Sequence, residues 1–450
     1  MTRTNHWWLL FLLNLPLLQE VTRKYFVYSD LVFVGADILV LGAAIAIGLQ
    51  GNLNLRSLPT AFLLLSAVFL VLTSVNHMAS GNHIGIYGVG LRATFLPIVY
   101  MLVSARYVSA VESGYDRIFV CVNLWIVIIG VIALLQVLLG KDHPINAVWG
   151  TSALGIGDFA TREKAVLIPG MFRPTSLFTH TGKFGQVIFT LVLFKWCYLL
   201  LSPVKRSRLL NLLMLFDLGV IFISGQRAAL MFLALAIFMA VAISSRQPLA
   251  SLQKLTIPAL FILVGLFGAW VAKPDLATAV YDRFGSVITA IHIRLEGNLW
   301  LPIQTMLEDY LFSGEGLGYY TFGSRLFGGH QVYEIKMEGL GESSFIRLSG
   351  EVGVLATLLV VLAYLYLVGR GFRVSKDLAG TSLASGALFY SVWVINLMLW
   401  SNTADVFANS IVTTFGFALS GASLVGARFG NKKDIDREGP ARSTLGCLPI

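Results

Sequence analysis

The sequence predicts an all-α, multi-pass membrane protein with about twelve transmembrane helices. Of its 450 residues, 56% are hydrophobic and only 13% are charged, whereas about a quarter of the residues in a soluble domain are charged. Apolar stretches long enough to cross a hydrocarbon layer of about 30 Å recur from end to end. We therefore expect residues 1–427 to form a single membrane domain, followed by a polar tail at 428–450.

The apolar stretches define the candidate membrane spans in order. The first, WWLLFLLNLPLL, is as short as a signal-peptide core, but QEVTRKY follows it in place of a small-residue cleavage site, so we interpret it as a first helix. The predicted spans are residues 7–18, 31–49, 58–75, 91–108, 118–139, 184–201, 208–223, 228–243, 255–271, 353–369, 385–400 and 405–425.

The distribution of Lys and Arg predicts the orientation, because short cytoplasmic loops carry an excess of these residues. With the amino terminus inside, the segments SPVKRSR, SSRQPLASLQK, GRGFRVSK and the tail ARFGNKKDIDR all fall inside. The net charge of +9 is then explained by topology, and we expect no nucleic-acid partner. The same count places three segments outside: 140–183, a turn at 224–227, and a large loop at 272–350 between the ninth and tenth spans.

Arginines stand out on the predicted outer half of the protein. A planar guanidinium pairs with phosphate oxygens and keeps its charge when partly desolvated, so these residues predict an anionic ligand. Arg227 begins a predicted helix whose positive end disfavours a cation, which also favours a bound anion, with a lipid-headgroup contact as the alternative. For Arg92 the favoured interpretation is an interfacial side chain that reaches toward the headgroups, with anion binding as the alternative. The four arginines are Arg92, Arg173, Arg227 and Arg347.

The segment that re-enters the membrane after the large loop carries two carboxylates with different expectations. If residues from 344 onward are helical, Arg347 and Glu351 lie four residues apart and form an ion pair. Glu342 precedes this helix, with Ser343 or Ser344 as its N-cap. Upstream, the glycine-rich run LFSGEGLGYY lacks the strand, helix and Lys-Ser/Thr pair of a nucleotide site. We expect its glycines to let the loop turn tightly.

Four segments together resemble the O-antigen ligase and polymerase superfamily of bacterial glycan-assembly enzymes, over roughly residues 165–370. They are FRPTSLFTHTGKFGQ, SGQRAALMFLAL, GEGLGYYTF and GESSFIRLSGEVGVLATLL. The resemblance implies a C-type glycosyltransferase-like fold in the bacterial inner membrane, with the active site facing the periplasm. It implies transfer of glycan from an undecaprenyl-diphosphate carrier to an acceptor glycan, with inversion and without a metal ion or cofactor. Arg173 and Arg227 match the family arginines that hold the diphosphate.

The family's re-entry motif implies the catalytic residue. It starts with a His-Asn pair nine residues before Glu-x-Gly, and counting back from Glu351 places Glu342 and Ser343 there. Since the histidine is associated with the ligase branch, Glu342 favours a polysaccharide repeat-unit polymerase. In that role Glu342 is the general base that takes the proton of the acceptor hydroxyl. Reserve candidates are His180 and His330, and Tyr319 and Tyr320 either stack on sugar rings or are ordinary interfacial tyrosines.

Two other functions stay open at this point. A ligase would pass the finished glycan to a lipid or protein, and a transporter or flippase would carry it across the membrane. A transporter typically shows paired half-repeats, and no duplication is evident, although Asp37, Lys195 and Asp217 within spans could serve a proton relay. The Asp-x-Asp triplet at 434–436 lies in the inner tail, so we expect no metal site. A chain-length-regulating partner is left open.

Overall fold

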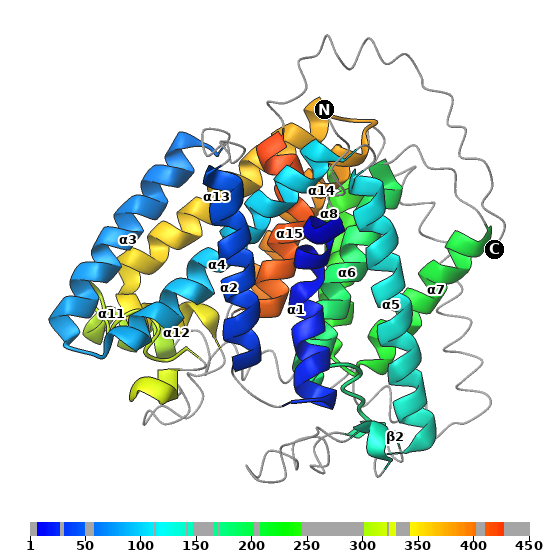
Figure 1. Cartoon of the computed structure of the whole chain (residues 1–450), viewed down its shortest axis with the longest axis horizontal. Helices are drawn as coiled ribbons and strands as arrows, with labels where there is room; N and C mark the ends of the chain where they lie inside the picture. Colours follow the sequence, from blue (N-terminus) through cyan, green and yellow to red (C-terminus); the bar gives the residue numbers. More distant parts are fainter. Residues whose placement is uncertain are drawn as a thin grey trace.

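The described part of the chain is a bundle of long helices (Figure 1). The computed structural model describes residues 7–27, 31–49, 58–111, 114–140, 143–146, 166–168, 171–201, 208–244, 301–321, 324–329, 343–401 and 410–426. Its long helices are α1 (Trp7–Tyr25), α2 (Leu31–Leu49), α3 (Thr60–Ser80), α4 (Ile84–Ala110), α5 (Gly114–Leu139), α6 (Thr181–Leu201), α7 (Arg208–Ile223), α8 (Arg227–Ser244), α13 (Val354–Asp377), α14 (Ser382–Trp400) and α15 (Ser410–Gly426).

These helices have the properties of membrane spans. Within the described residues, seven are long and apolar enough to cross a membrane, namely α3, α4, α5, α6, α8, α13 and α14, and shorter apolar helices lie within α2, α7 and α15. The fold is therefore that expected of a multi-pass membrane protein. Every predicted span except the ninth overlaps a described helix. Residues 255–271 and the tail at 428–450 lie outside the described residues, so the count of twelve stays a prediction.

Helix α4 begins earlier than the sequence predicts, at Ile84 rather than at residue 91. The ring of His83 caps it, because Gly85 N donates to His83 Nδ1 at 3.0 Å. Residues of the first turns pack against the loop that precedes α12, so a glycine-rich start is stabilised by tertiary contacts that a hydropathy pattern does not show. Arg92 consequently lies well inside α4 and not at its mouth. There it forms an ion pair with Asp37 of α2.

The core of the bundle is built around α6 and α14. Nearly every residue of α6 from Phe184 to Leu199 is buried, and Trp393 of α14 donates its indole N–H to Thr190 Oγ1 at 3.1 Å. Small residues let neighbouring helices approach closely: Gly416 of α15 lies against the Trp393 ring, and Gly421 against the backbone of α4. A second polar contact in the core joins Lys195 of α6 to Asp217 of α7 at 2.8 Å.

The two interhelical ion pairs bear on the transport hypothesis. Asp37, Lys195 and Asp217 were the within-span polar residues that could have formed a relay. In the structure Asp37 pairs with Arg92, and Lys195 pairs with Asp217, each across one helix interface. Intramembrane charges are stabilised by such pairing. The arrangement is that of two separate interhelical contacts, one joining α2 to α4 and the other joining α6 to α7.

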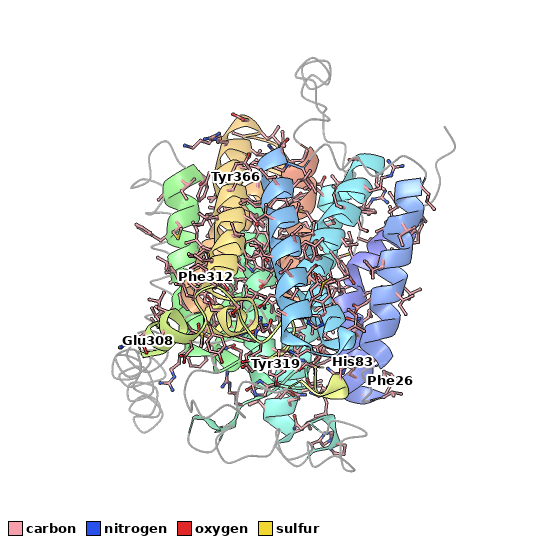
Figure 2. The ribbon with its side chains drawn as sticks, turned by 90° about the vertical axis from the view of Figure 1, so that its left-hand side faces the viewer. Phe26, His83, Glu308, Phe312, Tyr319 and Tyr366 are labelled. Atoms are coloured by element: carbon pink, nitrogen blue, oxygen red, sulfur yellow. The ribbon has the colours of Figure 1, made fainter. Side chains whose placement is uncertain are left out.

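The short elements gather at one end of the bundle, drawn at the bottom of Figure 1 and called the lower end below. Figure 2 shows Phe26, His83, Glu308, Phe312 and Tyr319 toward this end, with Tyr366 of α13 farther up. The described parts of all three segments predicted to lie outside meet here, which agrees with the predicted alternation of loops; which side of the membrane they face stays a prediction. The elements are η2 (Pro144–Asn146), β1 (Val166–Ile168), β2 (Met171–Phe172), α11 (Leu301–Asp309), η5 (Ser324–Phe327) and α12 (Ser344–Val352). Strands β1 and β2 pair antiparallel.

Candidate functional site

The glycine-rich run folds as a loop, residues 310–321, around the end of α12; we call it the glycine loop. Gly316 and Gly318 have φ angles of 107° and 92°, which side-chain-bearing residues rarely adopt. A Cβ on Gly318 would also collide with the carbonyl of Ile86 and the backbone of Gly90 in α4. The expectation that these glycines allow a tight turn is therefore confirmed. Backbone bonds fix the loop: Glu315 N donates to Gly350 O and Gly316 N to Glu351 O, both at 2.8 Å.

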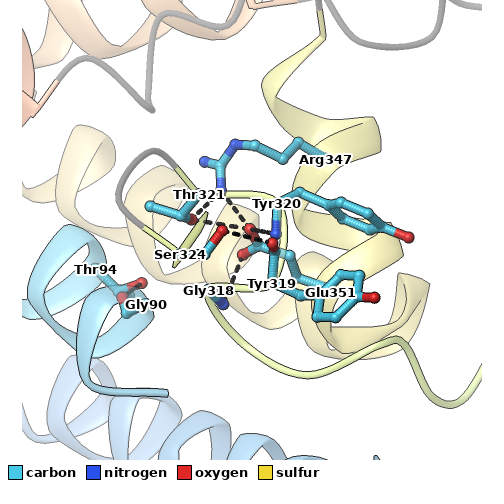
Figure 3. A network of polar contacts seen from close by, with 9 residues as sticks. All are labelled: Gly90, Thr94, Gly318, Tyr319, Tyr320, Thr321, Ser324, Arg347 and Glu351. Carbon is cyan, nitrogen blue, oxygen red and sulfur yellow. Dashed lines mark hydrogen bonds and ion pairs between the residues drawn. The ribbon is translucent and has the colours of Figure 1, made fainter. Parts of the chain in front are cut away.

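The anion held by the glycine loop is a carboxylate of the same chain (Figure 3). Glu351 Oε2 accepts from Gly318 N at 3.1 Å. Its Oε1 accepts from Tyr320 N at 3.1 Å and from Thr321 Oγ1 at 2.8 Å. Successive backbone N–H groups in such a turn form an anion-binding concavity. The loop resembles a phosphate-binding loop because it performs the same electrostatic task, with Glu351 as its anion.

Arg347 completes this centre from the same helix. Its NH1 donates to Glu351 Oε1 at 3.0 Å and to Thr321 Oγ1 at 2.9 Å, which confirms the predicted ion pair between residues four apart on a helix. The side chain is 7% exposed. The structure thus gives Arg347 an internal carboxylate and lends no support to its predicted contact with a diphosphate. The same holds for Arg92, whose side chain pairs with Asp37.

A cavity of about 50 Å³ adjoins the Arg347–Glu351 pair, between α4, α12, α13 and α15. Its polar lining comes from five residues with hydroxyl groups in addition to the ion pair. Of the four arginines predicted to bind an anion, Arg347 lines it, whereas Arg92, Arg173 and Arg227 do not. The lining residues with polar side chains are Thr94, Thr321, Ser344, Arg347, Glu351, Tyr364 and Thr413.

The two tyrosines of the glycine loop differ in what they offer a ligand. Tyr320 is 8% exposed, and its ring lies against Gly350 of α12. Tyr319 is half-buried and meets Tyr320 edge to face, with ring centroids 5.0 Å apart. Burial raises the pKa of both phenols. Of the two tyrosines, Tyr319 is thus the one with a partly exposed ring for a sugar, whereas Tyr320 is part of the loop's own packing.

A second group of charged side chains lies where α6 and α8 begin. We call Arg173, His180, Lys183 and Arg227 the basic cluster. Arg173 follows β2, and its Nε donates to Ser224 O at 2.7 Å, in the turn that leads into α8 at Arg227. Lys183, in the first turn of α6, donates to Glu20 Oε1 of α1 at 3.0 Å. The structure therefore brings Arg173 to the turn that precedes Arg227; that the two arginines share an anion stays a prediction.

His180 sits immediately before α6 and its protonation follows from its contacts. Surrounding protein desolvates the imidazole although part of the ring stays accessible, and the cations Lys183 and Arg173 act in the same direction, so the pKa of His180 is lowered. Gly182 N donates to His180 Nδ1 at 3.0 Å. In the neutral ring the proton is therefore on Nε2. With Nδ1 accepting from Gly182 N, Nε2 is the nitrogen that His180 presents to a ligand; its reserve role as the general base stays a prediction.

The Arg347–Glu351 pair and the basic cluster are connected through the end of α14. At the start of α12, Ser344 N donates to Ser401 O at 3.1 Å. The adjacent Trp400 ring stacks on Phe232 of α8 at 5.4 Å and meets Phe189 of α6 edge-on at 5.5 Å. The amino end of α12 is thus joined to the two helices that begin in the basic cluster. Glu342 and His330 lie outside the described residues, and Ser343, which follows Glu342, is fully buried.

Comparison with known proteins adds no identification. No protein-family model matches the chain, and no curated protein sequence matches it significantly. The resemblance to glycan-assembly enzymes therefore rests on the residues quoted above. As for a metal centre, the described residues hold no group of three His, Cys, Asp or Glu side chains close enough to bind an ion.

Several residues that hold the basic cluster in place were missed at the level of sequence. Glu20 and Lys24 near the end of α1, Gln136 in α5 and Ser176 after Arg173 are fully or almost fully buried. The signal that could have identified Gln136 is its isolation, as the one amide in the apolar run VIALLQVLL. A lone buried amide needs hydrogen-bond partners, but the sequence does not show where those partners lie.

Proposed function

We propose that this protein is a glycosyltransferase that uses a lipid-diphosphate-linked glycan, and specifically a polysaccharide repeat-unit polymerase. The proposal includes about twelve transmembrane helices in a C-type glycosyltransferase-like fold, a bacterial inner membrane, and a lower end that faces the periplasm. The observation that carries it is the basic cluster. Arg173 reaches the turn before Arg227, the first residue of α8, and Lys183 lies in the first turn of α6, where it pairs with Glu20. Helix amino ends favour anions.

The main chemical requirement of this reaction is that the protein binds the diphosphate leaving group and stabilises its charge. The acceptor hydroxyl oxygen attacks the anomeric carbon, the bond from that carbon to the diphosphate breaks, and its electron pair leaves on undecaprenyl diphosphate. Guanidinium groups stabilise the charge that develops on the departing diphosphate. In this scheme Arg173 and Arg227 hold the diphosphate, and the neutral Nε2–H of His180 donates to one of its oxygens.

The proton of the acceptor hydroxyl is assigned to Glu342. It precedes Ser343 and Ser344, which are both buried, and Ser344 N donates to Ser401 O at the end of α14. The bond from Ser344 to the end of α14, where Trp400 stacks on Phe232 of α8, supports this assignment. A carboxylate base of this kind contributes about 10² to 10⁴ in rate. Attack from the face opposite the diphosphate inverts the anomeric configuration, and the scheme needs no metal ion.

Substitution of the two arginines tests the proposal. In cells that make the cognate glycan, Arg173→Ala and Arg227→Ala are each expected to lower elongation by about 10² to 10³, because each removes a charged donor to the leaving group. Single repeat units should then accumulate on the carrier while the protein stays at its normal level in the membrane. The matched control is Arg373→Ala, which removes an exposed arginine of α13 beyond Tyr366, toward the other end of the bundle.

The products separate this function from its alternatives. A polymerase yields longer carrier-linked chains, whereas a ligase yields glycan attached to a new lipid or protein acceptor. Normal elongation in both arginine variants would exclude the diphosphate clamp. Full activity of Glu342→Gln at neutral pH would remove Glu342 as the base, since an amide cannot accept the proton.

A further inference from the structure

The turn that carries Arg173 has a backbone that does not form without support. Ser176, three residues later, has a φ of 51°. Among the described residues, no other non-glycine residue has a positive φ. This left-handed conformation is unfavourable for a residue with a Cβ, and it persists only where the surroundings impose it. Ser176 is fully buried. Its surroundings therefore determine the conformation of the Arg173 turn.

Gln136 of α5 forms hydrogen bonds with both backbone polar groups of Ser176, the N–H and the carbonyl. Ser176 N donates to Gln136 Oε1 at 2.7 Å, and Gln136 Nε2 donates to Ser176 O at 3.0 Å. Gln136 Nε2 also donates to Ile145 O at 3.1 Å, which ties η2 to the same point. Gln136 is 0% exposed, and both of its bonds to Ser176 are buried, where an unmade bond is most costly.

Helix α1 supplies the second half of this support. The buried Lys24 donates from Nζ to Thr175 Oγ1 at 2.7 Å and also to Ser176 O. The phenol of Tyr25 lies 3.3 Å from both Ser176 O and Ile145 O and shares its one proton between them. The carbonyl of Ser176 thus accepts from three side chains on two helices. Between this carbonyl and Arg173 lie only Pro174, whose φ is fixed by its ring, and Thr175.

We propose that Gln136 is a positioning residue for Arg173, acting through the strained backbone of Ser176. The proposal rests on the proposed function, because it assigns Gln136 the task of aiming a diphosphate ligand. Gln136 does not touch the substrate. Its two hydrogen bonds to Ser176 stabilise the left-handed conformation of that residue. Because the link through Pro174 is short and stiff, the conformation of Ser176 fixes where Arg173 lies, and Arg173 Nε then reaches Ser224 O.

The test combines a disabling and a restoring substitution. Gln136→Leu removes these hydrogen bonds at similar volume, and Gln136→Glu keeps the acceptor for Ser176 N but loses both donated bonds. We expect Gln136→Leu to lower kcat/KM by about 100-fold, the usual effect of a misplaced binding group, and Gln136→Glu to lower it less. Adding Ser176→Gly should restore most of the loss, because glycine adopts positive φ without these hydrogen bonds. A merely space-filling role for Gln136 would not respond to Ser176→Gly.

A second readout does not depend on enzyme activity. Arg173→Cys is placed in a chain without the native cysteines, and its labelling by a membrane-impermeant maleimide is timed. The rate should rise when Gln136→Leu is added and return toward its original value with Ser176→Gly. The matched control is Asn123→Leu, which removes an amide on the same helix that donates only to its own helix, at Phe119 O.

The outcomes separate the two proposals. An unchanged labelling rate in both Gln136 variants overturns the positioning inference, whatever the activity. A changed and restored labelling rate supports the inference, and if Arg173→Ala nevertheless elongates glycan normally, the proposed function fails while the positioning of residue 173 stands. Loss of activity that Ser176→Gly does not restore also counts against the inference.

Discussion

Glu351→Gln is the substitution that most directly tests how the glycine loop is held. In the structure Glu351 Oε1 accepts from Tyr320 N, Thr321 Oγ1 and Arg347 NH1, and Oε2 accepts from Gly318 N. An amide keeps one oxygen for the first set of donors but places an N–H group opposite Gly318 N. The variant therefore loses one backbone bond outright and the negative charge that strengthens the others.

The magnitude follows from these contacts. A hydrogen bond to a charged group contributes about 1.5–3 kcal/mol, and removing one partner of a buried ion pair costs about 3–5 kcal/mol because the other charge stays buried. Glu351→Gln retains part of the geometry, so we expect a loss near the lower end of that range, about 3 kcal/mol. The comparison is Glu308→Gln, an exposed carboxylate of the nearby α11, with a change within about 0.5 kcal/mol.

Amide hydrogen exchange locates the effect, and thermal unfolding of the purified protein measures its size. A local loss of about 3 kcal/mol speeds exchange by about 10². The amides of Gly318 and Tyr320 should exchange faster in Glu351→Gln. The amide of Glu315 should respond least, because it donates to a backbone carbonyl, Gly350 O. Unchanged exchange at Gly318 and Tyr320 would refute the role assigned to the Glu351 carboxylate.

The double variant Glu351→Leu with Arg347→Met separates an anion-binding loop from an ordinary ion pair. Replacing both partners of a buried ion pair by apolar residues is often neutral or stabilising. Here the double variant should stay destabilised, since the amides of Gly318 and Tyr320 still lack their acceptor. Full recovery of stability would show that the loop does not depend on the carboxylate.

Three further predictions follow from single contacts. Lys195→Met should destabilise the bundle by about 3 kcal/mol, because Asp217 is left buried without its cation. Adding Asp217→Leu should restore most of the unfolding temperature, and glycan elongation should be normal in the double variant. A proton-coupled transporter that uses this pair would stay inactive. Because the pKa of His180 is lowered in the folded state, the unfolded state binds the proton first, so stability should fall as the pH drops below about 6.5 and should fall less in His180→Gln, as measured by pH-dependent unfolding. Gly318→Ala should prevent the glycine loop from closing on α4, seen as increased protease cleavage within residues 310–321.

The helices themselves were predictable because hydrophobic length is a local property of the chain. The start of α4 was not, and the reason is specific. Gly85 and Gly90 weaken a helix on propensity alone, but in the structure Gly85 faces the Phe327 ring and Gly90 faces the backbone of Gly318. The contacts that make glycine suitable there come from a loop more than two hundred residues away. As a result the sequence placed Arg92 at a helix mouth, whereas it lies inside α4 and pairs with Asp37.

In the candidate site, too, some contacts could be predicted from the sequence and others could not. The pair of Arg347 and Glu351 was predictable because their spacing of four residues is a rule of helix geometry. The bonds from the glycine loop to Glu351 were not, because backbone amides carry no residue-specific signal; only the glycines, which permit positive φ, hinted at them. The hydrogen bonds between Gln136 and Ser176 could not be predicted from the sequence, because they depend on where α5 and the Arg173 turn meet in space.

We assign the four predicted arginines to two classes. Arg92, which is half-buried, and Arg347, which is buried, each pair with a carboxylate of the chain itself, so we expect both to contribute mainly to stability. Arg173 donates from Nε to Ser224 O in the turn before Arg227, and its charge contributes to the lowered pKa of His180. If the lower end binds a diphosphate, its affinity should consequently depend on Arg173 and Arg227, and substitution of Arg92 or Arg347 should act through stability. Measuring pyrophosphate binding and unfolding temperature on the same four alanine variants distinguishes the classes: a loss of binding without a loss of stability is expected only for Arg173 and Arg227.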